Sequence, residues 1–141
     1  MELKVYTHKV KYYETDAMKI VHHSNYIRWM EEAKMDFLDQ LDCGMVKVES
    51  AGITSPVVSV ECSYKQPTIF DDEIAIQVKV EKCTGVKLML EYLMTNTATG
   101  AVVATGRSCN CYVDRNGNPI SIKKHFPQFD VALKALTTEN G

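Results

Sequence analysis

The chain has 141 residues, enough for one domain with a substantial core and short for two. Its composition, 45% hydrophobic and 24% charged, is that of an ordinary soluble globular protein. A formal net charge of -2 gives no general attraction to nucleic acid or to an anionic membrane surface. No apolar run reaches transmembrane length and the N-terminus lacks an apolar signal region, so we expect no membrane insertion. These properties predict a single domain over residues 1–141, located in the cytoplasm.

The cysteine and histidine residues do not suggest a metal site. The five cysteines are Cys43, Cys62, Cys83, Cys109 and Cys111. Their number is odd and their spacing fits no zinc pattern, so we interpret them as free thiols in a reducing compartment. His22 and His23 are adjacent, and no third ligand is apparent near them in the sequence. We therefore expect neither a metal nor a redox cofactor.

The first predicted elements are a strand and a long helix, joined by an irregular segment that carries Asp16. Residues 3–13 are rich in Val, Tyr and Thr and favour a strand. One apolar face at a period of 3.6 residues then predicts a helix over residues 24–42. That face is formed by Tyr26, Trp29, Met30, Ala33, Phe37 and Leu41. Ser24 or Asn25 can cap the start of this helix, and Gly44 lies just past its end.

The remainder of the chain is predominantly strand. Residues 45–56 are irregular, with room for a short helical turn. Four strands are predicted, at residues 57–65, 74–81, 87–94 and 101–113, and the side chains alternate most clearly in 74–81 and 87–94. The turn signals between neighbouring strands are Thr84-Gly85 and Thr99-Gly100, so these strands should pair antiparallel. Asn116-Gly117 marks a further turn, and a short helix is expected over residues 127–136.

This order of elements predicts an α+β domain with one antiparallel sheet and one long amphipathic helix. A single helix covers only one face of such a sheet. The other face and the sheet edges then require cover or a partner. We therefore expect a homo-oligomer.

The segment around Asp16 is the strongest candidate for chemistry. Asp16 lies just before the start of the long helix, where backbone N–H groups lack partners and the helix dipole is positive. A carboxylate beside such an oxyanion site suits the hydrolysis of an activated acyl group. The alternative is structural, because aspartate is common in loops as the first residue of an Asx turn.

Two blocks of residues carry a resemblance to a known family. The first block holds Asp16, His23, Asn25 and Tyr26. The second reads Tyr64-Lys65-Gln66-Pro67-Thr68-Ile69-Phe70-Asp71-Asp72. With the order of elements over nearly the whole chain, these blocks resemble the hotdog-fold acyl-CoA thioesterases, in the branch of 4-hydroxybenzoyl-CoA thioesterase and YbgC-like proteins.

The resemblance implies a fold and an activity. The fold is an antiparallel sheet wrapped around one long central helix, and the assembly is a homodimer or homotetramer with active sites at subunit interfaces. The activity is hydrolysis of an acyl-CoA thioester to a free acid and CoA. Met18-Lys19 departs from the smaller residues that relatives carry, which leaves the shape of the acyl pocket open.

The resemblance also assigns roles to residues. Asp16 matches the catalytic aspartate, as a nucleophile or as a general base toward water. His23 is the position whose backbone N–H polarises the thioester carbonyl. Asn25, Tyr26 and Lys65 are assigned to substrate binding, with loop support, core packing and a turn as their respective structural alternatives. A helical glutamate, as used in another hotdog branch, is a weaker second candidate at Glu31-Glu32, which points away from the apolar face.

Two other functions remain open at this point. One is a thioesterase that acts on acyl carrier protein instead of CoA. The other is a non-catalytic hotdog domain that binds acyl-CoA. Asp16 favours an enzyme, because a binding domain has no need of a reactive carboxylate.

Overall fold

The computed structural model describes residues 3–137 of the chain. These residues include a five-stranded antiparallel sheet. The expected domain of residues 1–141 extends beyond this part at residues 1–2 and 138–141. The spatial order of the strands is β1-β3-β4-β5-β2. Their bounds are β1 Tyr6–Lys9, β2 Val57–Tyr64, β3 Glu73–Cys83, β4 Lys87–Asn96 and β5 Val102–Cys111.

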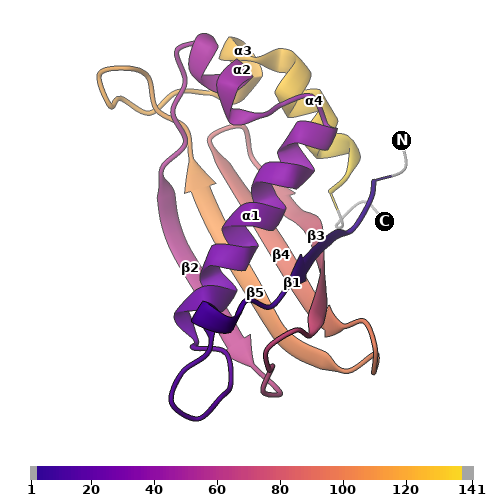
Figure 1. The fold of residues 1–141 in the computed structure, drawn as a ribbon. Helices are drawn as coiled ribbons and strands as arrows, with labels where there is room; N and C mark the ends of the chain where they lie inside the picture. The colour runs from indigo at the N-terminus through magenta and orange to yellow at the C-terminus, as the bar shows by residue number, and fades with distance from the viewer. Residues whose placement is uncertain (1–2, 138–141) are drawn as a thin grey trace.

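One long helix crosses a single face of this sheet (Figure 1). This helix, α1, spans Ser24–Gln40, and the short α2, Met45–Ser50, follows it. Two further helices close the chain beyond one end of the sheet, α3 at Ile122–His125 and α4 at Pro127–Ala135. The α+β hotdog architecture predicted from the sequence, a sheet against one long helix, is therefore confirmed.

The core lies between α1 and the sheet. The predicted apolar face of the helix is buried, with Trp29 and Ala33 fully enclosed, except that Leu41 lies past the end of α1 and is half-buried. The sheet contributes inward-facing side chains of β3 and β4 to this core, among them Ile74, Ile76, Leu90, Tyr92 and Met94. Met30 packs directly over Gly106 of β5, where a β-carbon would lie 2.8 Å from the Met30 thioether. Glycine at this position therefore permits the close approach of helix and sheet.

The two ends of α1 differ from the predicted ones. The N-cap is His23, and neither Ser24 nor Asn25 caps the helix through its side chain. The chain leaves the helix through Asp42, which has a φ of 60°, a left-handed conformation that aspartate tolerates. Gly44 has a φ of -64° and instead precedes α2 as its N-cap. The predictions of a Ser24 or Asn25 cap and of a glycine terminator at Gly44 are wrong.

The strands agree closely with the predicted ones, except for the first. The predicted strand over residues 3–13 shortens to β1, and the chain then turns through the 3₁₀ helix η1, Tyr12–Glu14. This turn carries the chain away from the sheet toward Asp16. Gly85, Gly100 and Gly117 all adopt positive φ, as their predicted turns require. The short helix α3 was not predicted.

Strand β2 forms one edge of the sheet and is open on both faces. Each of its eight residues is exposed or half-buried, and Val58 and Tyr64 keep 54% and 46% of their accessible surface. It is bonded to β5 on one side only. An apolar edge strand of this length is a template for pairing with another strand.

Candidate functional site

Asp16 lies in a short closed loop between η1 and α1. Its backbone N–H donates to the Ile20 carbonyl at 2.8 Å, and Thr15 pairs with Val21 in an isolated antiparallel bridge. Lys19, at the tip, has a φ of 66°. The loop is therefore a small hairpin-like unit whose base lies against the first turn of the helix.

The Asp16 carboxylate has one committed oxygen and one free oxygen. Oδ1 accepts the Met18 backbone N–H at 2.8 Å, which is the Asx turn considered from the sequence. Oδ2 has no hydrogen-bond partner among residues 3–137. The turn thus fixes the orientation of the carboxylate and leaves one oxygen available for chemistry. The structural and catalytic interpretations of Asp16 are compatible.

The first turn of α1 presents a free backbone donor at His23. The Ser24 N–H donates to His22 Nδ1, and the Asn25 N–H donates to the His22 carbonyl. In the described part of the chain, the His23 N–H has no acceptor. The positive end of the helix dipole lies at the same place. A carbonyl oxygen placed here would meet both a donor and a favourable potential.

A hollow of about 430 Å³ joins the loop, the helix start and the segment after β2. Four of the predicted site residues line it, namely Asp16, His23, Tyr26 and Lys65. The rest of its wall is mainly apolar and comes from Met18, Ile20, Val21, Tyr64 and Pro67, together with Gln66. The two sequence blocks, about forty residues apart, thus meet at one place.

Tyr26 and Lys65 occupy this hollow differently. Tyr26 is almost fully buried, and its hydroxyl donates to Thr68 Oγ1 at 2.9 Å. Burial raises the pKa of this phenol, and the hydrogen bond to Thr68 only partly offsets that effect. Tyr26 is therefore a neutral wall residue that also belongs to the core. Lys65 is exposed at the rim, where its ammonium can meet an anionic group.

Asn25 does not line this hollow. Its Nδ2 donates to the Glu14 carbonyl at 2.9 Å and more weakly to the His22 carbonyl at 3.4 Å. The side chain therefore ties the helix to the base of the Asp16 loop. This is the loop-supporting alternative, and substrate binding by Asn25 stays a prediction.

Glu14 is a residue that sequence reasoning missed. It is 5% exposed, and both of its carboxylate oxygens accept hydrogen bonds. Oε1 accepts from the Lys11 N–H at 2.8 Å and lies 2.8 Å from His8 Nε2, while Oε2 accepts from Trp29 Nε1 at 2.8 Å. Nothing in the sequence distinguishes Glu14 from an exposed glutamate, because its partners lie up to fifteen residues away.

The Glu14 carboxylate is ionised in this setting. Burial alone would raise its pKa, but the hydrogen bonds from His8, Lys11 and Trp29 together outweigh burial and lower the pKa below its usual value. A buried charge of this kind is stable only when its partners are in place. Glu14 therefore holds β1, η1 and α1 together.

The other side of Asp16 opens on a wider and more polar hollow. It has about 830 Å³ and includes Arg28, Glu31 and Glu32 of α1. The glutamates are already engaged, since Lys34 binds Glu31 at 3.0 Å and the Tyr6 hydroxyl donates to Glu32 at 3.1 Å. Asp16 is thus the carboxylate shared by both hollows.

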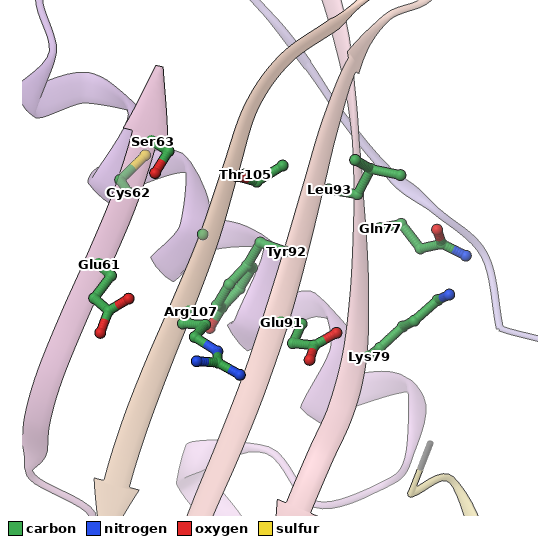
Figure 2. Close-up of a pocket in the computed structure, with 11 residues that line it drawn as sticks. Glu61, Cys62, Ser63, Gln77, Lys79, Glu91, Tyr92, Leu93, Thr105 and Arg107 are labelled. Carbon is green, nitrogen blue, oxygen red and sulfur yellow. The ribbon is translucent and has the colours of Figure 1, made fainter. Parts of the chain in front are cut away.

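A hollow of similar size, about 420 Å³, lies on the face of the sheet that α1 does not cover (Figure 2). Figure 2 shows a row of charged side chains across four neighbouring strands, in the order Glu61, Arg107, Glu91 and Lys79. Adjacent members have opposite sign, which stabilises cross-strand pairs. Neither Asp16 nor His23 lines this hollow, so it brings together none of the predicted catalytic residues.

Thiol and metal chemistry find no support near Asp16. Burial raises the pKa of Cys62, as it does for Cys43 and Cys83, so these thiols are not activated nucleophiles. Within residues 3–137, no three His, Cys, Asp or Glu side chains are grouped closely enough to hold a metal ion.

None of the helices described here is long and apolar enough to cross a membrane.

Comparison with known sequences places the chain in one family. Residues 10–134 match the thioesterase-like superfamily. A putative acyl-CoA thioesterase, YneP of Bacillus subtilis, is 32% identical over 89% of this chain and 91% of its own length. The long-chain acyl-CoA thioesterase FadM of Escherichia coli is 27% identical over 68% of this chain and 72% of its own length.

Solved structures agree with this assignment. The DHNA-CoA thioesterase of Staphylococcus aureus superposes with a TM-score of 0.89, at 26% identity over 97% of this chain and 94% of that one. A hypothetical protein of Aquifex aeolicus gives a TM-score of 0.82, at 31% identity over 90% of this chain and 98% of that one. The predictions of a hotdog fold and of a thioester hydrolase are confirmed, while the narrower 4-hydroxybenzoyl-CoA and YbgC-like branch stays a prediction. The chain belongs to the thioesterase-like superfamily.

Proposed function

We propose that the protein hydrolyses an acyl-CoA thioester to a free acid and CoA, with Asp16 as the reactive carboxylate. The observation that carries this proposal is the meeting of Asp16 and His23 on one hollow, each with a polar group that lacks a partner among residues 3–137. A carboxylate oxygen and a backbone donor are the two groups that acyl transfer requires.

Asp16 can act in either of two ways. As a nucleophile, Oδ2 forms a bond to the thioester carbonyl carbon, the C–S bond breaks, and water then hydrolyses the resulting anhydride. As a general base, Asp16 takes a proton from a water molecule whose oxygen attacks that carbon, and the C–S bond then breaks as the proton passes to the leaving thiolate. Both routes consume one water and yield one acid and one thiol. The Asx turn serves both, because it orients the free oxygen.

The His23 N–H is the proposed donor to the thioester oxygen. Negative charge develops on this oxygen as the tetrahedral intermediate forms, and a fixed N–H at a helix start stabilises it. Because the donor belongs to the backbone, His23→Ala should lower kcat by no more than about tenfold. A much larger loss would assign the role to the imidazole instead.

Charge and polarity around the site favour a CoA thioester. The apolar wall that includes Met18 and Ile20 suits an acyl group, while Lys65 on one side of Asp16 and Arg28 on the other can meet phosphates. Relatives named for acyl-CoA and DHNA-CoA substrates support the same choice. An acyl carrier protein thioester and a non-catalytic acyl-CoA-binding domain remain the alternatives.

We further propose that two or more copies assemble in the cytoplasm through the open edge strand β2. This strand ends at Tyr64, which itself lines the Asp16 hollow, so a copy paired along β2 would border the site. Light scattering at micromolar concentration should give at least a dimer, and Val60→Lys should weaken it by placing a charge on the edge. A stable wild-type monomer with full activity would contradict this assembly.

A panel of short, long and aromatic acyl-CoAs, assayed by release of free thiol, tests the function. The wild type should hydrolyse at least one of them, and Asp16→Asn should lower kcat on the best substrate by at least about 10²-fold. Tight binding without hydrolysis across the panel would favour the non-catalytic alternative. Hydrolysis of acyl carrier protein thioesters alone would favour the other one.

A further inference from the structure

The Asp16 loop is anchored at its base by one buried residue, Glu14. The side chain of Glu14 reaches His8 on β1 and Trp29 on α1, and it also accepts the Lys11 N–H at the start of η1. Its backbone carbonyl accepts the His22 N–H and Asn25 Nδ2, both at 2.9 Å. A single residue thus joins the sheet, the helix and both ends of the loop.

We infer that Glu14 is a positioning residue that sets the place of the Asp16 carboxylate relative to the first turn of α1. The inference rests on the proposed function of Asp16. Asp16 follows Glu14 by two residues, and His22, which Glu14 also holds, directly precedes His23. A shift of Glu14 would therefore move the reactive carboxylate and the proposed carbonyl donor relative to each other.

The requirement at this position is for two acceptor oxygens. The Lys11 and Trp29 N–H groups are permanent donors, and each addresses a different oxygen of Glu14. Glutamine has the same shape but only one acceptor oxygen. In either orientation of its amide, the NH₂ group faces one of these N–H groups. Glu14→Gln is therefore a nearly isosteric way to loosen the anchor.

The matched control is Tyr6→Phe. The Tyr6 hydroxyl donates to Glu32 at 3.1 Å, so this change also removes a hydrogen bond between β1 and α1. It removes no direct contact of Glu14 or of the loop, although Glu32 also lies 3.8 Å from His8 Nδ1 through its other carboxylate oxygen. If Glu14→Gln loses more activity than Tyr6→Phe, the excess reflects the anchoring of the loop and not the general loss of a hydrogen bond between β1 and α1.

The first measurement is steady-state hydrolysis of the best acyl-CoA, at a temperature where circular dichroism shows each variant to be folded. Glu14→Gln should lower kcat by roughly 10–10²-fold with KM little changed, because small misplacement of a reactive group is costly. Tyr6→Phe should stay within about twofold of the wild type. Wild-type kcat in folded Glu14→Gln would overturn the inference.

The second measurement is amide hydrogen exchange, which needs no substrate. In Glu14→Gln the amides of Asp16, Met18 and His22 should exchange faster, while those of the central strands β3 and β4 keep their wild-type rates. Equal acceleration in the loop and the sheet would reveal general destabilisation and would overturn a positioning role. Unchanged loop exchange would do the same.

These outcomes separate the inference from the proposed function. If Asp16→Asn retains full turnover, the function of Asp16 is wrong whatever Glu14→Gln does, and the positioning role fails with it. If Asp16→Asn is inactive and Glu14→Gln is fully active, only the inference fails. Should Glu14→Gln not fold, Trp29→Phe can take its place, because it removes the donor to Oε2 while retaining an aromatic ring. Its loop amides should also exchange faster than those of the wild type, and its kcat should fall less than that expected for Glu14→Gln.

Discussion

The first turn of α1 and the remaining turns of the same helix have different surroundings. The later turns place Met30, Ala33 and Phe37 against the sheet, where the contacts are apolar and repeat with the helix period. The first turn lies against an irregular loop: Tyr26 packs into the core, but Asn25 donates a hydrogen bond to Glu14, and the His23 N–H has no acceptor among residues 3–137. Apolar packing is therefore concentrated along the helix, while the proposed reactive groups lie at its start.

Trp29 lies where these two regions meet, and its replacement should have the largest effect on stability. Its ring is fully buried and its Nε1 donates to Glu14. Trp29→Ala should lower the free energy of unfolding by about 3–5 kcal/mol, through a large cavity and a lost donor. Urea unfolding measures this, with Tyr13→Ala as the control, since Tyr13 is 83% exposed and should change stability by no more than about 0.5 kcal/mol. A small effect of Trp29→Ala would show that the helix does not pack as described.

The buried carboxylate of Glu14 should make the loop region sensitive to acid. Its pKa is lower in the folded protein than the ordinary 4.5, so the unfolded chain binds the proton more readily. The stability that Glu14 contributes is therefore complete above about pH 4.5 and is lost as pH falls through the lower, folded pKa. Below about pH 4.5, the free energy of unfolding measured in urea should fall more steeply with decreasing pH for the wild type than for Glu14→Gln. Parallel pH profiles would contradict this account of the anchor.

Two buried tyrosines under the packed part of the helix should give the smallest effects and should differ from each other. The Tyr92 hydroxyl bonds Ser108 Oγ at 2.7 Å, whereas the Tyr112 hydroxyl has no partner among residues 3–137. Tyr92→Phe should cost about 1 kcal/mol because Ser108 is left unsatisfied. Tyr112→Phe should be neutral within about 0.5 kcal/mol or stabilising. Equal costs in thermal unfolding would mean that the Tyr112 hydroxyl is satisfied after all.

The same contrast explains which features could be predicted from the sequence. The buried face of α1 and the strands β3 and β4 follow from periodicity, since each side chain is placed by its own element. The loop region does not follow, because its contacts join residues that are distant in the chain. Glu14 meets Trp29 fifteen residues later, and Asn25 donates to Glu14 instead of capping its own helix.

The candidate site could be predicted in part from the sequence, for a similar reason. Asp16 and His23 are close in sequence at a helix start, so local reasoning could place them together. Lys65 joins them only because β2 ends beside that start, which a resemblance suggested and periodicity could not. The left-handed turn at Asp42, two residues past the end of α1 at Gln40, was missed because Gly44 gave the more familiar signal for a helix end.

We propose that the Asp16 carboxylate performs the chemistry and contributes little to the fold. The most direct test is a single-turnover experiment with enzyme in excess over the best acyl-CoA, comparing wild type with Asp16→Asn at equal occupancy. The variant should hydrolyse the bound thioester at least about 10²-fold more slowly, with an unchanged melting temperature and retained substrate binding. A variant that hydrolyses the bound thioester at nearly the wild-type rate would contradict it.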